Sequence, residues 1–225
     1  MTSPGPSGPK LSSRKYSGVA PEERVRLRRA AILESALEQF GTSGYAAASI
    51  KQICRGAGVT ERYFYESFPN REVCLAALYD NLAEAMRAAT ITALEQAEPD
   101  LDSLTAAGLG GFIGYLSSDP RRARVVLIEV VGVSPDMEQR RHRVLRDFVD
   151  TVTTIWTTDS PHAPVRSRRL TVTALVGGVN HLLVDWLMDG RRDDPADLVA
   201  VCVDLFAAAR AQWEAVAASS QRPLD

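Results

Sequence analysis

Three pairs of residues, each an Asp or Ser followed by proline, divide the C-terminal part of the sequence into helical segments. They are Asp119-Pro120, Ser134-Pro135 and Asp194-Pro195. The oxygen of an Asp or Ser side chain accepts hydrogen bonds from the first N–H groups of a helix, and proline suits the first helical position. Apolar residues recur every three or four positions along the chain, without the alternation that strands show. We therefore predict an all-α chain of about nine helices.

The N-terminal part predicts three helices separated by tight turns. The first begins at Pro21 and should end at the glycines of 41–44, because glycine adopts backbone conformations that end helices. A capping-box spacing over 49–52 predicts the start of the second helix. The glycines of 56–58 predict a turn, after which Thr60 is expected to cap the third helix. This arrangement is typical of a helix-turn-helix, whose third helix enters the DNA major groove.

The third helix has a divided surface. Phe64 and Phe68 lie four residues apart and should pack on the first two helices, while polar and tyrosine side chains face other directions. Guanidinium groups can hydrogen-bond to guanine edges, and hydroxyl groups can donate to phosphate oxygens, so this outward face suits DNA. Two alternatives remain open. Arg62 could form a surface ion pair with Glu66, four residues on, and Tyr65 could bond to the protein backbone.

Charge separates the N-terminal segment from the rest of the chain. Residues 1–71 carry 11 Lys and Arg against 6 Asp and Glu, a balance of +5. The remaining 154 residues carry 15 and 22, a balance of −7. A basic segment suits a polyanion such as DNA, although chance scatter of surface charge would give a similar pattern. The first 18 residues are rich in Pro, Gly and Ser, which predicts a flexible tail.

Three motifs occur in order along the N-terminal part: F-G-x-x-G-Y at 40–45, S-I-x-x-I-C-x-x-A-G-V at 49–59 and Y-F-Y-x-x-F-x-N-R-E at 63–72. With these motifs, residues 24–78 resemble the DNA-binding domain of the TetR family of bacterial transcriptional regulators. The resemblance implies DNA contacts from Ser49, Lys51, Thr60, Glu61, Arg62, Tyr63, Tyr65, Ser67 and Arg71. Two positions depart from the family pattern: Phe64 replaces the usual Leu, and Ser67 stands where His is frequent.

The resemblance also implies a domain plan. It gives a flexible basic tail at 1–20, a helix-turn-helix DNA-binding domain at 21–70 and a larger helical ligand-binding and dimerisation domain at 71–218. Helices four to seven would enclose a pocket for a small, largely apolar effector. Candidate pocket residues are large, and apolar or tipped with one polar group: Met86, Phe112, Tyr115, Ile128, Phe148 and Trp156. Each of them could instead belong to the plain core.

Two C-terminal segments are candidates for a dimer interface. Residues 165–189 are apolar on nearly all sides, and residues 195–218 carry one apolar stripe. By resemblance, these helices from two subunits would form a four-helix interface with two-fold symmetry. The candidate interface residues are Leu175, Gly178, Leu182, Trp186, Val201 and Leu205. The alternative is that both helices are covered within one subunit.

Other classes of function have weaker support. The glycines of 108–114 have a GxGxxxG spacing, but the residues before them are helical in pattern, whereas a dinucleotide fingerprint follows a strand. His181 and Asp185 lack the further ligands that a metal site needs, and no Ser-His-Asp signature is present. We therefore expect no cofactor, no metal and no enzymatic activity. The chain has no uninterrupted apolar run of about 18 residues and no secretory leader, which predicts a cytoplasmic protein without a membrane span.

These observations together predict a ligand-responsive transcriptional regulator that acts as a repressor. It would bind a palindromic operator in double-stranded DNA as a homodimer and leave the operator when a small molecule binds. The main alternative is a helical small-molecule-binding protein or enzyme with a vestigial helix-turn-helix. A second alternative is a DNA-binding protein that responds to no effector.

Overall fold

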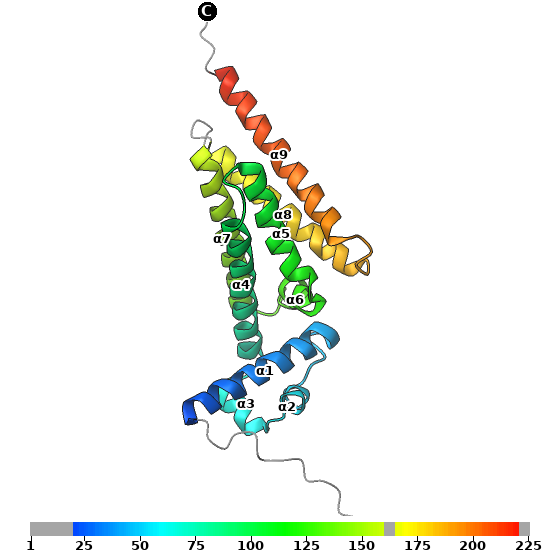
Figure 1. Ribbon diagram of the computed structural model, residues 1–225. Coiled ribbons are helices and arrows are strands. Elements are labelled where there is room, and N and C mark those ends of the chain that lie inside the picture. Colours follow the sequence, from blue (N-terminus) through cyan, green and yellow to red (C-terminus); the bar gives the residue numbers. More distant parts are fainter. Residues whose placement is uncertain (1–19, 160–164, 221–225) are drawn as a thin grey trace, which may run out of the picture.

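The computed structural model describes residues 20–159 and 165–220 and contains helices but no strand within these ranges (Figure 1). The first three helices are α1 (Pro21–Ser43), α2 (Ile50–Ala57) and α3 (Glu61–Ser67). The others are α4 (Arg71–Glu95), α5 (Leu101–Ser117), α6 (Pro120–Arg124), the π-helix η2 (Val125–Glu129), α7 (Pro135–Asp159), α8 (Val165–Met188) and α9 (Pro195–Ser220). The predicted all-α fold is confirmed. The predicted N-terminal tail, up to residue 19, lies outside the described residues.

The helices form a small N-terminal unit and a larger body. In Figure 1, α1 crosses one end of the molecule beside α2 and α3, and α4 leads from this unit into the body. Within the body α4 packs on α5, α5 packs on α9, and α7 packs on α8. The short helix α6 contacts α1, so the segment after α5 returns to the N-terminal unit.

Side chains cap the starts of α2 and α4. Both halves of the capping box are present, because Ser49 Oγ accepts a hydrogen bond from Gln52 N–H at 3.3 Å and Gln52 Oε1 accepts one from Ser49 N–H at 2.8 Å. Asn70 begins α4 by accepting a hydrogen bond from Val73 N–H at 2.8 Å. Gly58 ends α2 with a φ of 65°, a backbone conformation that glycine adopts without strain.

Three local predictions need correction. Gly56 lies inside α2 and not in the turn, and a Cβ added there would come within 2.2 Å of Ser35 Oγ, so glycine allows α1 and α2 to pack closely. Thr60 precedes α3, but its side chain makes no capping hydrogen bond. The segment predicted as one helix over 120–131 divides into α6 and the π-helix η2. Short π-helical segments are rare and are often found at functional sites.

A continuous apolar core fixes α3 to the N-terminal unit. Phe64 and Phe68 are both 0% exposed, as predicted, and their ring centroids lie 5.7 Å apart. Ile32 and Phe40 of α1 and Ile53 of α2 are also 0% exposed and belong to the same core cluster. The short helix therefore has a fixed inner face, and its outer face remains free for contacts outside the chain.

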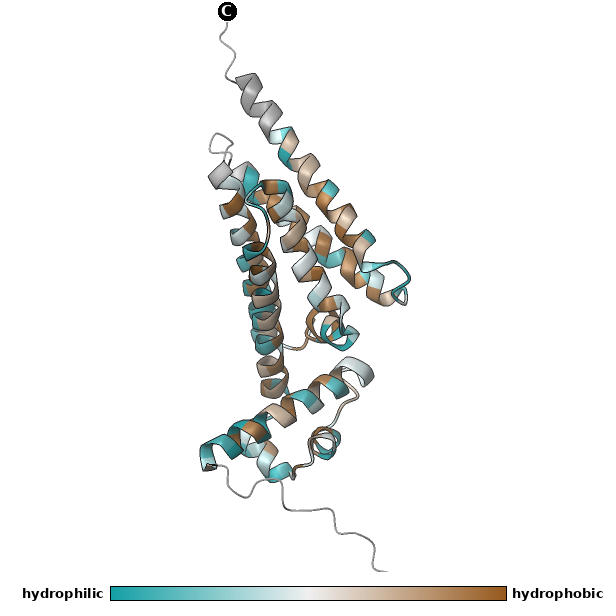
Figure 2. Ribbon diagram, in the orientation of Figure 1, coloured by the Kyte–Doolittle hydropathy of each residue, from teal (hydrophilic) through white to brown (hydrophobic). Residues whose placement is uncertain are grey.

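The helix α8 is unusually apolar for one that lies at the molecular surface. By length and composition alone, its residues Arg168–Met188 could cross a membrane, although only 22% of that window is buried. A search for an uninterrupted apolar run misses this property, because polar residues such as Asn180 and Asp185 interrupt the run. A helix that covers another protein surface has the same composition. Hydrophobic residues also recur along much of α9 (Figure 2).

Candidate DNA interface and effector cavity

The outward face of α3 carries exposed aromatic and charged side chains. Tyr63 and Tyr65 are 36% and 53% exposed, whereas Phe64 between them is fully buried. Arg62 forms the surface ion pair that the sequence left open, with 3.0 Å between its Nε and Glu66 Oε1. The Arg62 side chain is 84% exposed, and an exposed pair of this kind contributes only about 0.5 kcal/mol. A phosphate or base edge could therefore replace Glu66 at little cost.

Arginines of α1 add positive charge beside this face. The Arg28 guanidinium lies 4.4 Å from the centre of the Tyr63 ring, which holds the ring against α1. Arg29 lies 4.2 Å over the Phe68 ring and donates a hydrogen bond to the Ser67 carbonyl at 3.0 Å. The site prediction from sequence missed Arg28. The arginine-rich run at 24–29 is the signal that could have indicated it.

The remaining residues predicted to contact DNA differ in their exposure and in the hydrogen bonds that they already make. Four are exposed: Ser49, Lys51, Thr60 and Glu61. The half-buried Ser67 donates its hydroxyl to the Tyr63 carbonyl at 3.1 Å. The half-buried Arg71 donates to the Ala48 carbonyl and lies 4.3 Å over the Tyr45 ring. Arg71 therefore ties the start of α4 to the turn between α1 and α2, in addition to any role at DNA.

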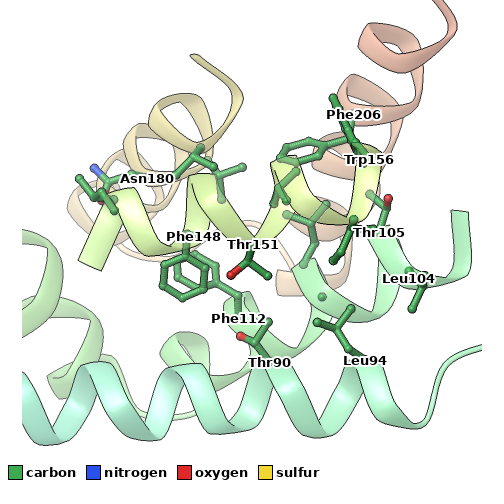
Figure 3. A pocket seen from close by; sticks show the side chains of 17 residues that line it. Thr90, Leu94, Leu104, Thr105, Phe112, Phe148, Thr151, Trp156, Asn180 and Phe206 are labelled. Atoms are coloured by element: carbon green, nitrogen blue, oxygen red, sulfur yellow. The ribbon is translucent and has the colours of Figure 1, made fainter. Parts of the chain in front are cut away.

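An apolar cavity of about 90 Å³ lies inside the body, among α4, α5, α7, α8 and α9 (Figure 3). Three predicted pocket residues line it: Phe112, Phe148 and Trp156. The Phe112 and Phe148 rings meet edge to face, with centroids 5.0 Å apart, and Phe206 of α9 meets Trp156 in the same way at 5.8 Å. Gly108, from the glycine-rich part of α5, also lines the cavity, and a Cβ added there would contact Leu94 Cδ2 at 3.4 Å.

The other predicted pocket residues lie elsewhere. Met86 is 1% exposed and lines a smaller cavity of about 20 Å³, which shares Phe112 and Phe148 with the larger one. Tyr115 lies beneath the Arg122 guanidinium, at 4.9 Å, and Ile128 belongs to η2. Neither of these two lines the apolar cavity, so we leave both out of the proposed pocket.

A charged groove of about 320 Å³ adjoins the apolar cavity between α4 and α7. The two spaces share Thr90, Leu94, Phe148 and Thr151. The groove contains three arginines and three carboxylates: Arg87, Arg140, Arg143, Asp80, Glu84 and Asp147. Two of these arginines are already paired with carboxylates, at distances of 2.5–2.9 Å. The body thus combines an uncharged inner cavity with a charge-balanced outer groove.

Comparison with known proteins agrees with this geometry. Residues 32–78, from α1 to α4, match the family described as bacterial regulatory proteins, tetR family. The N-terminal unit, over these residues, is a TetR-family DNA-binding domain. The HTH-type transcriptional regulator EthR of Mycolicibacterium smegmatis is 30% identical over 112 residues, which are 50% of this chain and 51% of EthR. The match therefore spans about half the length of that relative.

Solved structures show the same fold over most of this chain. The fatty acid degradation regulator FadR from Bacillus halodurans is 18% identical with a TM-score of 0.71, over 79% of this chain and 93% of its own. FadR from Bacillus subtilis, solved in complex with stearoyl-CoA, is 19% identical with a TM-score of 0.66, over 78% of this chain and 96% of its own. At these sequence identities, the similarity shows a shared fold only.

Glu129, at the end of η2, joins the body to the N-terminal unit. Its Oε2 accepts a hydrogen bond from Tyr45 N–H at 2.6 Å, in the turn after α1. Its Oε1 accepts one from Arg124 Nε at 2.8 Å, and Arg124 Nη1 donates to the Thr42 carbonyl at 3.2 Å. The π-helix is therefore bonded directly to the turn that leads from α1 to α2.

Arg121 makes a second link across the same junction. Its Nη1 donates to Glu38 Oε2 of α1 at 2.8 Å, and its other nitrogens bond to the Asp119 carboxylate. The hydrogen bond from Arg121 lowers the pKa of Asp119, and the same bond raises the pKa of Arg121. Gly41 permits this approach, because a Cβ added there would lie 2.5 Å from Arg121 Cβ. The junction is thus both closely packed and ionic.

The surface formed by α8 and α9 is apolar and open. A groove of about 440 Å³ runs between the two helices, and five of the six predicted interface residues line it: Leu175, Gly178, Leu182, Val201 and Leu205. Val201 and Leu205 are 51% and 55% exposed. A Cβ added at Gly178 would meet nothing within 4 Å, so no other described part of the chain packs closely on this glycine.

Trp186 differs from the other predicted interface residues. It is only 5% exposed, and its Nε1–H donates a hydrogen bond to the Asp193 carbonyl at 3.0 Å. It therefore packs inside the subunit and fixes the turn between α8 and α9. We leave Trp186 out of the proposed dimer interface.

Proposed function

We propose that this TetR-family transcriptional regulator is a homodimeric repressor in the cytoplasm that binds a palindromic operator and leaves it when a small, largely apolar molecule fills the body. Residues 21–70 would form the DNA-binding domain, and residues 71–218 the ligand-binding and dimerisation domain. The observation that carries the proposal is the division of α3: Phe64 and Phe68 are fully buried, while Arg62, Tyr63 and Tyr65 are exposed. A helix held in this way can enter the major groove without unfolding any part of the core.

The proposed dimer rests on the uncovered apolar surface of α8 and α9. Leu170 and Met188 of α8 are 62% and 71% exposed, and Val201 and Leu205 of α9 are half-exposed. Apolar surface of this extent is rarely left in water by a soluble protein. A second copy meeting the same surface across a two-fold axis would cover it and would hold two α3 helices on one side of a duplex.

The proposed effector response rests on the position of η2. On one side, Val126 and Leu127 line the small cavity together with Phe112 and Phe148, which also line the effector cavity. On the other side, Glu129 is bonded to the turn after α1. A ligand that moves the two phenyl rings would therefore shift the support of the N-terminal unit. The ligand acts only as far as its affinity differs between the DNA-bound and the released conformations.

The proposed role of the body also agrees with the Bacillus subtilis FadR structure, in which a protein of this fold holds stearoyl-CoA. A regulator built in this way needs no catalytic group, and we propose that this chain is not an enzyme. Among the described residues, no group of three or more His, Cys, Asp or Glu side chains could hold a metal ion.

The experiment that tests the proposal is an affinity titration against duplexes selected from a random pool. Several phosphate contacts in each half-site predict that the logarithm of the association constant falls linearly with the logarithm of salt concentration, with a slope of about −4 or steeper. Sequential addition of unlabelled random duplex should displace the protein only at large excess. A flat salt dependence, or equal affinity for all duplexes, would exclude an operator-binding regulator.

A further inference from the structure

The effector cavity contains no charged side chain among the 17 residues that line it. Its polar side-chain groups are three threonine hydroxyls, the indole N–H of Trp156 and the side-chain amide of Asn180. Moving a charged group from water into such a space costs several kcal/mol unless a partner of opposite charge is present. The charged residues of the outer groove lie beyond the shared rim formed by Thr90, Leu94, Phe148 and Thr151. The inner cavity therefore favours a ligand group without charge.

Two of the threonine hydroxyls are already used by their own helices. Thr90 donates to the Met86 carbonyl at 3.0 Å, and Thr151 donates to the Asp147 carbonyl at 2.9 Å. The side-chain amide of Asn180, by contrast, makes no hydrogen bond to any other residue that the structure describes. The Asn180 side chain is half-buried, so water can reach its amide. A ligand that displaces this water must supply a hydrogen-bonding group of its own, because an amide left unpaired in apolar surroundings costs about 1–3 kcal/mol.

The two ends of the cavity are lined by different residues. In Figure 3, Asn180 lies at one end, Phe112 and Phe148 follow, and Trp156 lies towards the other end with Thr105. Asn180 also lines the small cavity that contains Val126 and Leu127 of η2. Arg141 lines that cavity too, and its Nη1 lies 3.5 Å from Glu138 Oε2, so a carboxylate already balances its charge. A ligand bonded to Asn180 would therefore place its polar group next to the segment that supports the N-terminal unit, and its apolar part between the aromatic rings.

We propose that Asn180 determines the specificity of the effector cavity, and that the effector is an uncharged molecule with an apolar body and one terminal group that donates and accepts hydrogen bonds. A primary amide is the simplest such group, because it is complementary to the Asn180 side chain. This inference rests on the proposed ligand-responsive function. It adds the chemical class of the ligand and the residue that selects it.

The test uses four probes of nearly equal shape: 4-phenylbutanamide, 4-phenylbutanoate, 4-phenylbutylamine and butylbenzene. Their dissociation constants are measured by calorimetry on the full chain at pH 7.5, for the wild type and for Asn180→Leu. We expect the wild type to bind the amide at least tenfold more tightly than either charged probe. Asn180→Leu should weaken binding of the amide about tenfold and should change binding of butylbenzene less than twofold.

Asn81→Leu is the matched control, because Asn81 is exposed on α4 away from the cavity and the same substitution there should change none of the four constants. Equal or tighter binding of the carboxylate would overturn the inference and would instead indicate a charged group held in the outer groove. An equal loss for all probes in Asn180→Leu, or no binding of any probe to the wild type, would also overturn it. The proposed repressor function would fail only if the same wild-type preparation also failed to bind its selected duplex.

Discussion

Removal of one hydroxyl group from α3 tests the proposed DNA contact without altering the fold. The substitution is Tyr65→Phe. The Tyr65 ring is 53% exposed and meets the Phe64 ring edge to face, with centroids 5.7 Å apart. Phenylalanine retains this ring contact and removes only the group that would donate to a phosphate oxygen.

The expected effect follows from the type of hydrogen bond. A neutral donor bonded to a charged acceptor contributes about 1.5 kcal/mol or more. Each subunit of a dimer would lose one such bond, so the operator complex should lose about 3 kcal/mol, which is about a hundredfold in affinity. The free energy of unfolding should change by less than about 0.5 kcal/mol, because no buried contact of Tyr65 is removed.

Fluorescence anisotropy with a labelled operator duplex measures the affinity, and thermal melting of the free protein measures the stability. Tyr115→Phe is the control, since it removes a tyrosine hydroxyl from the body of the protein and should leave the affinity for DNA unchanged. Unchanged affinity in Tyr65→Phe would refute the predicted contact. A lower affinity with an equally large loss of stability would show that the hydroxyl supports the fold instead.

Three further substitutions test other parts of the structure. Glu129→Gln weakens the acceptor of the 2.6 Å bond from Tyr45 N–H, so hydrogen exchange at that amide should become about tenfold faster, and an unchanged rate would argue against the link. Gly111→Ala places a Cβ 3.0 Å from the Ala89 carbonyl oxygen and should destabilise the protein by about 1–3 kcal/mol. Gly110→Ala is the control, because a Cβ there meets open space and should stabilise the helix slightly. Equal melting temperatures of the two variants would contradict this packing argument. Leu205→Lys should weaken the dimer about a hundredfold by sedimentation, while Val131→Lys, equally exposed, should not.

The sequence predicted the local structure of the N-terminal unit well, because capping residues and helical periodicity act over a few residues. The capping box at Ser49 and the buried pair Phe64 and Phe68 are examples. It failed where a distant part of the chain decides the outcome. Gly56 lies inside α2, where a Cβ would come within 2.2 Å of Ser35 Oγ of α1, and no local pattern marks η2 as a π-helix.

The site was only partly predictable for the same reason. Large apolar residues recur along all the long body helices, so periodicity does not separate those that line a cavity from those that fill the core. Phe148 lines the effector cavity, whereas Trp186, equally plausible for an outer surface, is held inside the subunit by its bond to Asp193. Asn180 and Arg28 were missed because their importance depends on neighbours from other helices.

Hydroxyl-radical footprinting of the wild-type protein on its selected duplex tests most directly whether two α3 helices enter the major groove together. A dimer of the proposed kind predicts two protected half-sites related by a palindrome, with centres about 34 Å or a multiple of that distance apart. Loss of both protected half-sites in Tyr65→Phe under the same conditions would support α3 as the contact. A single protected site, or two sites without two-fold symmetry, would contradict the proposed dimer on its operator.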